Sequence, residues 1–201
     1  MTLSVSKSKT AILALDFVND IVHSEGKFAA RGLPAILAEQ GTIGNTKKLL
    51  EATRGKGLIV IHVARRHRAG YPDQPCHTQL DQRVKTSEAL LEDGWGAEFC
   101  DELKPQPGDI VIIKRRVDAF HGTDLNLILQ ARGIDTLVLT GVSTNFAVEG
   151  TARTAADAGY NVLIARDCVA AVTPELSAFS LNNILPTLAT VTTSTEVIAV
   201  L

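Results

Sequence analysis

The chain has 201 residues, of which 45% are hydrophobic, 21% charged and 4% aromatic, and its formal charge is −2. This near-neutral charge excludes nucleic-acid binding through bulk positive charge. The longest apolar runs hold about five residues, whereas a membrane-spanning helix needs roughly 18. Residues 1–10 contain no apolar core of a signal peptide. We therefore expect one soluble, cytoplasmic domain over residues 1–201, without nucleic-acid or membrane partners.

Short apolar runs alternate with longer amphipathic segments, which is typical of an α/β fold with a parallel sheet. The predicted strands are Ala11–Leu15, Leu58–Val63, Ile110–Ile113, Thr136–Thr140, Val162–Ala165 and Ala189–Thr193. The predicted helices are Pro34–Arg54, Thr123–Arg132, Asn145–Ala158 and Pro174–Leu188. The proline-rich segment at about 65–107 is expected to be a long excursion with short helices over one sheet edge. Together these elements predict a three-layer α/β/α fold around a doubly wound sheet.

Candidate functional residues follow the predicted strands, because ligands of doubly wound sheets bind at the carboxyl ends of the strands. Asp16 follows the first strand, and Lys114 ends the third. Each alone is typical of an ordinary loop or surface residue, but together they would project into one crevice, where the lysine favours an ionised aspartate. After the fourth strand, the run from Gly141 to Ala147 opens a helix whose first amides can bind an anion or oxyanion.

Four motifs in this order resemble the isochorismatase-like hydrolase superfamily, whose members are also called cysteine hydrolases. They are Asp16 with Asn19 and Asp20, Lys114 with 118–120 and 123–125, 141–145 with 151–153 and 156–160, and 166–171. The resemblance covers roughly residues 10 to 195. It implies a six-stranded parallel sheet of order 3-2-1-4-5-6 and a homodimer or homotetramer. It also implies hydrolysis of small amides or ureides through an Asp–Lys–Cys triad.

Carried over residue by residue, the resemblance puts the aspartate at Asp16, the lysine at Lys114 and the nucleophile position at Ala147. It also implies a cis peptide before Ser143 and an oxyanion hole from the amides near Phe146 and Ala147. Substrate contacts are expected from Phe17, Asn19, Phe120, Val142, Ser143, Thr144, Asn145 and Phe146. We expect no cofactor. We also expect no metal site, because 63–67 lacks the aspartate of the nicotinamidase branch.

Ala147 departs from the family pattern, because a methyl group cannot attack a carbonyl. Three accounts stay open. The chain is a hydrolase without a covalent intermediate, in which Asp16 protonates a vinyl ether as in true isochorismatases; or a C–N hydrolase with its nucleophile replaced; or a noncatalytic binding or scaffold relative. Neither Cys76 nor Cys100 is an evident substitute, and Cys168, the nearest by topology, is typical of a small buried hydrophobe.

Other residues are interpreted first as ordinary structure. His62 is expected to be a core histidine. The basic cluster Arg65, Arg66, His67 and Arg68 is expected to be a solvated loop, with an anionic-substrate grip or a subunit contact as the alternatives. Arg115 and Arg116 could add positive potential at the crevice, and Trp95 is a further candidate apolar wall beside Phe17, Phe120 and Phe146.

Overall fold

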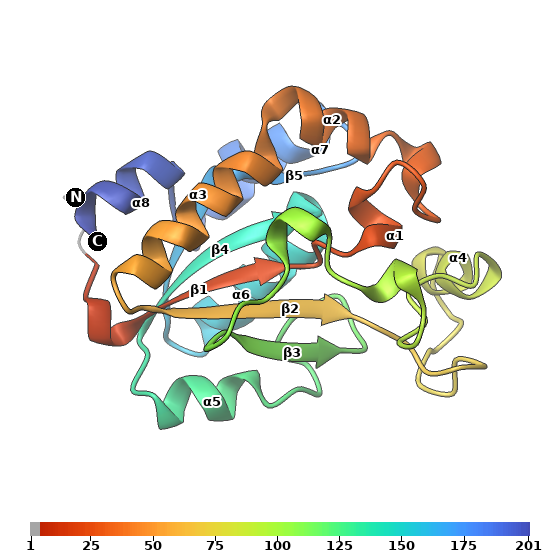
Figure 1. Ribbon diagram of the computed structural model, residues 1–201, viewed down its shortest axis with the longest axis horizontal. Coiled ribbons are helices and arrows are strands. Elements are labelled where there is room, and N and C mark those ends of the chain that lie inside the picture. Colours follow the sequence, from red (N-terminus) through yellow and green to blue (C-terminus); the bar gives the residue numbers. More distant parts are fainter. Residues whose placement is uncertain (1–4) are drawn as a thin grey trace.

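A computed structural model describes residues 5–201 and contains one six-stranded, all-parallel sheet. The strand order is β3-β2-β1-β4-β5-β6, which confirms the predicted sheet (Figure 1). The strands are β1 Thr10–Leu15, β2 Ile59–Arg65, β3 Ile110–Lys114, β4 Thr136–Val142, β5 Asn161–Ala170 and β6 Thr190–Thr192. The order reverses between β1 and β4, which are neighbours in the sheet, so a crevice opens beyond their carboxyl ends.

Helices cover both faces of the sheet and give three layers (Figure 1). They are α1 Asn19–Val22, α2 Leu33–Gln40, α3 Thr42–Gly55, α4 Gln79–Thr86, α5 Leu125–Ala131, α6 Glu149–Asp157, α7 Pro174–Phe179 and α8 Ser194–Val200. Within residues 5–201, no helix combines the length and apolar character needed to cross a membrane.

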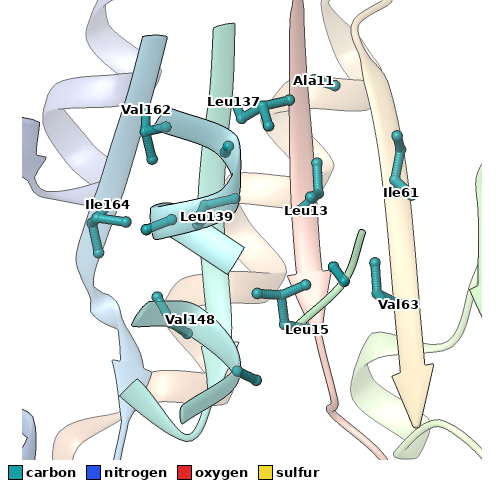
Figure 2. Close-up of a cluster of buried hydrophobic side chains, with 14 of the residues drawn as sticks. Ala11, Leu13, Leu15, Ile61, Val63, Leu137, Leu139, Val148, Val162 and Ile164 are labelled. Atoms are coloured by element: carbon teal, nitrogen blue, oxygen red, sulfur yellow. The ribbon is translucent and has the colours of Figure 1, made fainter. Parts of the chain in front are cut away.

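The core is divided by the sheet because successive strand residues point to opposite faces. On β1, Leu13 and Leu15 pack with α5 and α6, in the cluster drawn in Figure 2. Ile12 and Ala14 pack on the other face, against α2, α3 and α8. All of these strand side chains are at most 1% exposed. Burial on both faces is why the strands are continuous apolar runs in the sequence.

Three predicted helices are interrupted. The segment 34–54 forms α2 and α3, separated by Gly41 in a left-handed conformation with φ 66°. The segment 145–158 starts as a π-helix, η5 Thr144–Val148, before α6. The segment 174–188 forms α7, a π-helical turn (η6 Ser180–Ile184) and a 3-10 turn (η7 Leu185–Thr187). In η7, Pro186 cannot donate the amide bond that a continuing α-helix needs.

Helix α8 was not among the predicted helices, although its first residues carry a capping signal. Thr193 and Glu196 form a capping box, in which each side chain bonds the other residue's backbone amide. Strand β5 is also longer than predicted, and its pairing with β4 shifts register between Leu139 and Gly141. Val169 and Ala170, after the shift, pair with Gly141 and Val142. Strand β5 therefore extends along the end of β4 that leads into η5.

The excursion between β2 and β3 contains α4 and two 3-10 turns, η3 Trp95–Ala97 and η4 Asp101–Leu103, as the prediction of short helices required. In Figure 1, α4 lies beyond the carboxyl ends of the strands, and the chain then returns across the sheet towards β3. Phe99 pairs with Val18 in an isolated antiparallel bridge. The excursion therefore covers the crevice end of the sheet.

Candidate active site

Asp16 and Lys114 meet at the carboxyl ends of the strands, as their sequence positions predicted. The Lys114 Nζ lies 2.7 Å from the Asp16 Oδ2 and donates a second bond to the Val117 carbonyl at 2.6 Å. The Asp16 Oδ1 accepts a hydrogen bond of 2.8 Å from the Arg65 backbone amide. Lys114 is fully buried and Asp16 is 5% exposed. Both oxygens of this buried carboxylate therefore accept a bond from a protein N–H donor.

The register of the sheet explains how these residues meet. Strand β3 is separated from β1 by β2, and Lys114 pairs directly with Arg65, the last residue of β2. The side chain of Lys114 therefore crosses the end of β2 to reach Asp16. Asp16 also donates its own amide to the Val63 carbonyl at 2.8 Å. The backbone of β2 thus holds the aspartate from both its main chain and its side chain.

Asp16 adopts a left-handed backbone conformation with φ 58°, which is costly for a residue with a Cβ. This conformation interrupts the alternation of β1. Strict alternation would place Phe17 on the Leu13 face, but Phe17 packs with Ile12 and Ala14 on the opposite face and is fully buried. The substrate contact expected of Phe17 is therefore not available, because its ring is a core residue.

The turn after β4 forms a second wall of the site. The Val142–Ser143 peptide is cis, as the family resemblance implied. Gly141 has φ 130°, and a Cβ there would lie 2.3 Å from the Leu15 carbonyl oxygen, so only glycine fits beside β1. The Thr144 and Ser177 hydroxyls are 2.8 Å apart, which ties the turn to α7. The Phe146 amide donates to the Ser143 carbonyl, so the Ala147 amide stays the candidate oxyanion donor.

A cavity of about 300 Å³ connects these elements. Asp16, Ser143 and the 3%-exposed Ala147 lie on its wall. The remaining lining residues are largely apolar or basic. They are Ile21, Phe28, Arg31, Leu33, Arg65, Gln79, Leu80, Arg83, Val84, Leu90, Val117, Val142, Phe146 and Val172.

Several expected contact residues lie outside this cavity lining. Asn19 donates its side-chain amide to the Trp95 carbonyl at 3.0 Å, and so holds the excursion rather than a ligand. Trp95 is 46% exposed and lies edge-on to His23. Phe120 packs on Tyr160 with ring centroids 5.9 Å apart. Thr144 is buried against α7, and Asn145 also lies outside the lining.

The solvated-loop interpretation of the basic cluster is wrong for Arg65 and His67. Arg65 is 6% exposed, and His67 is fully buried. The Arg65 Nε donates to the His67 Nε2 at 3.1 Å, so the proton of the neutral ring is on Nδ1, 3.0 Å from Asp73 Oδ1. The Arg65 Nη2 donates to Gln74 and Asp81. Burial lowers the pKa of Arg65, and the charges of Asp16 and Asp81 oppose that shift.

Arg115 and Arg116 do not supply potential to the cavity. The Arg115 guanidinium bonds Glu92 at 2.7 Å, Asp73 at 3.3 Å and the Arg66 carbonyl. Arg116 donates to the Asp73 carbonyl at 2.7 Å. Neither residue lines the cavity. Both hold the excursion against the end of β3.

The thiols are placed away from the candidate nucleophile position. Cys168 and Cys100 are buried in the core on the α3 side of the sheet, and burial raises the pKa of each thiol to about 12. Cys76 is exposed in the excursion. None of the three lines the cavity formed by the described residues. A cysteine that replaces the missing nucleophile is therefore not found in the part of the chain that the structure covers.

Arg31 and Arg83 line the cavity and were not singled out by the sequence. Arg31 lies in the turn η2 Ala29–Arg31, and Arg83 lies on α4. Neither follows a strand, so the strand-end rule gives no signal for them. Among residues 5–201, no group of three or more His, Cys, Asp or Glu side chains is arranged to hold a metal ion.

The geometry defines an α/β protein with a buried Asp–Lys ion pair and a cis-peptide turn beside a cavity at the switch point of its sheet. The chain belongs to the isochorismatase-like hydrolases, because residues 10–196 match the family model described as the Isochorismatase domain. It is 32% identical to a ureidoacrylate amidohydrolase, RutB, of Rhizobium rhizogenes, over 86% of this chain and 75% of that protein.

Solved structures agree with this assignment. A cysteine hydrolase from Pseudomonas syringae pv. phaseolicola superposes with a TM-score of 0.85 at 26% identity, covering 98% of this chain and 94% of that one. An N-carbamoylsarcosine amidase from Thermoplasma acidophilum has a TM-score of 0.73 at 32% identity, covering 92% and 96%. Similarity to amidohydrolases thus accompanies a cavity whose wall includes Ala147.

Proposed function

We propose that this chain hydrolyses a small molecule with water as the nucleophile and Asp16 as the general base. One observation carries the proposal: the buried Asp16 carboxylate faces the cavity while it receives donors from Lys114 and Arg65. The cavity of about 300 Å³ limits the substrate to a small molecule. The homodimer or homotetramer implied by the family stays a prediction.

The two donors favour a base over an acid. A carboxyl group whose two oxygens both accept bonds from N–H donors is arranged as a proton acceptor, whereas the vinyl-ether account needs Asp16 to donate a proton. We therefore place a water molecule between Asp16 and the substrate carbonyl carbon. As its oxygen bonds to that carbon, its proton passes to Asp16. The negative charge moves to the carbonyl oxygen, which the Ala147 amide can stabilise.

The second step breaks the bond to the leaving group. The oxyanion re-forms its carbonyl, the carbon–nitrogen bond breaks, and Asp16 returns the proton to the leaving nitrogen. The products are an acid and an amine, and Asp16 ends ionised as it began. Lys114 stays next to Asp16 throughout, so its positive charge stabilises the negative charge that Asp16 regains when it releases the proton.

A second candidate function is a C–N hydrolase that needs a cysteine at position 147. Two features favour it: the amidohydrolases similar to this chain, and the position of the Ala147 methyl on the cavity wall beside Ser143. A thiol there would supply the nucleophile that the family resemblance implies. In this case the chain with Ala147 binds substrate without turning it over.

One activity panel separates these functions. Small amides, ureides and vinyl ethers, including isochorismate, are offered to the chain, to Ala147→Cys and to an Asp16→Asn/Lys114→Met double variant. The double variant removes the base without leaving a buried lysine unpaired. Asp157→Asn, an exposed carboxylate outside the cavity, is the matched control.

The outcomes are distinguishable. Turnover of an amide or ureide by the chain and by Asp157→Asn, but not by the double variant, supports water activation by Asp16. The same pattern with a vinyl ether contradicts it and supports an acid role for Asp16. Turnover that starts only in Ala147→Cys contradicts it and supports the second candidate. Silence from every form contradicts both and favours the noncatalytic account.

A further inference from the structure

Asp20 is a buried acid that the proposed mechanism does not use. It lies on α1 and is 4% exposed. Its Oδ2 accepts a hydrogen bond of 2.6 Å from the Leu90 backbone amide, and its Oδ1 accepts one of 3.1 Å from the Lys27 backbone amide. Among residues 5–201, no Lys, Arg or His side chain forms an ion pair with Asp20. The carboxyl group is therefore held by main-chain donors from two other segments.

The segments that Asp20 holds also line the cavity. Leu90 is 1% exposed, follows α4 in the excursion and is a lining residue. Phe28, next to Lys27, is another, and its amide donates to the Asp20 carbonyl at 2.9 Å. Ile21, next to Asp20 on α1, is a third. Asp20 is thus bonded or adjacent to apolar lining residues from two distant parts of the chain.

Leu90 has a backbone conformation that needs support from its surroundings. Its φ is 60°, in the left-handed region that residues with a Cβ rarely adopt. Such a conformation persists only where the surrounding structure over-determines it. Both main-chain polar groups of Leu90 are bonded, since its amide donates to Asp20 and its carbonyl accepts the His67 amide at 2.7 Å. Without Asp20, a buried amide would lose its acceptor at a residue that is already strained.

The excursion approaches Asp20 closely at a second point. Gly96 lies in the 3-10 turn η3, and a Cβ at this position would clash with the Asp20 carboxyl group. A residue without a side chain is therefore needed for this approach. The excursion is seated on Asp20 at both Leu90 and Gly96.

We propose that Asp20 is a positioning residue, which fixes Leu90 and the turn at 27–28 and so determines which substrates fit the apolar part of the cavity. Asp20 itself is not a lining residue, so it acts through these neighbours and not through contact with a ligand. Loss of its bonds would free the lining without altering the Asp16–Lys114 pair. The effect on catalysis rests on the proposed function, whereas the hold on the lining does not.

The hold on the lining is measured without a substrate, by amide hydrogen exchange. In Asp20→Ala, the Leu90 and Lys27 amides should exchange about 10-fold faster or more, because each loses its acceptor. This rise is counted beyond any rise at the slowest amides of β1 and β4, which report global unfolding. Asp20→Asn keeps one acceptor oxygen and should retain protection at one of the two amides, so it preserves the test if Asp20→Ala does not fold.

The matched control for exchange is Asp167→Ala. Asp167 also accepts a backbone amide from a distant segment, that of Ser194 at 2.7 Å, but lies outside the cavity lining. Its loss should speed exchange at Ser194 and not at Leu90. The assignment is overturned if the Leu90 and Lys27 amides in the Asp20 variants rise no more than the slowest amides do.

The consequence for the substrate is measured by steady-state kinetics with the amide or ureide that the chain turns over best. Leu90→Ala removes lining atoms but keeps the backbone bond, and should raise KM on the order of 10-fold with a smaller change in kcat. Asp20→Asn should raise KM too. Because Asp20 acts partly through Leu90, the double variant should show less than the product of the two fold-changes.

The kinetic outcomes separate this proposal from the proposed function. Independent effects of Asp20→Asn and Leu90→Ala, or a loss of kcat at unchanged KM, would overturn the positioning role. If the chain turns over no substrate, the proposed function is contradicted, and the exchange rates at Leu90 and Lys27 alone decide whether Asp20 fixes the lining.

Discussion

Two groups of buried charged side chains lie near the ends of neighbouring strands, and only one of the two groups borders a cavity. At the carboxyl ends, Asp16 and Lys114 border a cavity. Towards the amino end of β3, Asp109 accepts bonds from Arg54 at 2.7 and 3.1 Å, from the Gln106 amide at 2.8 Å, and lies 3.1 Å from His62 Nε2. None of these four residues lines the cavity.

The difference shows that burial and ion pairing alone do not mark a functional site. Asp109 has both oxygens occupied by protein donors and faces no open space, so its cluster joins α3 to the sheet. Arg54 and hydrogen bonding lower the pKa of Asp109 although burial raises it. Asp16 has comparable pairing, but its carboxylate also faces a space that a ligand can enter. Each prediction below tests one side of this contrast.

The largest expected effect is on turnover at Asp16. Asp16→Asn/Lys114→Met should reduce kcat/KM by about 10² to 10⁴, which is the usual contribution of a general base. Asp16→Asn alone should also destabilise the fold by about 3 kcal/mol, because it leaves Lys114 buried without its anion. Steady-state kinetics and urea unfolding of both variants measure the two effects separately. An active double variant would contradict the base role.

Asp109→Ala should lower the free energy of unfolding by about 3 kcal/mol and leave kcat/KM unchanged. The low end of the usual range applies because the Arg54 side chain is 19% exposed and can be partly hydrated. The matched control is Asp101→Ala, whose side chain is 89% exposed and pairs only with Lys104. It should leave both stability and kcat/KM essentially unchanged, because solvent screens this surface pair. A loss of activity in folded Asp109→Ala would remove the contrast between the clusters.

The sheet was predictable because each strand carries its own signal. Burial on both faces makes β1, β2 and β4 mostly apolar. The segments that follow the strands carry apolar residues at helical spacing, which predicts helices. Asp16 and Lys114 were found because each is directly adjacent to such a run. The interruption of the predicted helices was harder to see, since the π-helix η5 has no distinct residue pattern.

The rest of the site depends on contacts that bring distant segments together. The burial of Arg65 and His67 needs Asp73, Gln74 and Asp81, which reach them only after the excursion folds back. Their sequence, rich in charge, is otherwise typical of a loop. Phe17 is the opposite case, because its position next to Asp16 predicts a site residue. The left-handed backbone conformation of Asp16 instead directs its ring into the core.

Gly141→Ala tests whether the turn after β4 needs its close approach to β1. The new Cβ would lie 2.3 Å from the Leu15 carbonyl, at φ 130°, so β4 or the turn must move. We expect a loss of about 2 kcal/mol in stability and a lower kcat/KM from the displaced turn. Gly159→Ala is the control, because it has φ 86° but open space around the Cβ. Its stability should fall by about 1 kcal/mol with unchanged kinetics. Equal kinetics in the two variants would show that the turn does not need this close approach.

The smallest expected effect is the pH dependence of stability that comes from the two buried histidines. Burial lowers the pKa of both His62 and His67 below the ordinary value of 6.5, although Asp109 and Asp73 respectively oppose the shift. Because each folded-state pKa lies below the unfolded-state one, the unfolded chain binds more protons under pH 6.5. The free energy of unfolding is therefore highest above pH 6.5, where the histidines are neutral in both states. It falls as the pH drops towards the folded-state pKa, by at most about 1.4 kcal/mol per pH unit per histidine.

His62→Gln and His67→Gln should each remove one part of this loss in urea unfolding between pH 5 and 8. Only His67 should also affect the substrate, because protonation of its Nε2 breaks the bond from Arg65, which lines the cavity. It also places a cation beside Arg65 and Arg115. We therefore expect KM to rise at acid pH in the chain and in His62→Gln, and this rise to be reduced in His67→Gln. The same KM profile in both variants would show that the hydrogen bond from Arg65 to His67 does not position the cavity wall.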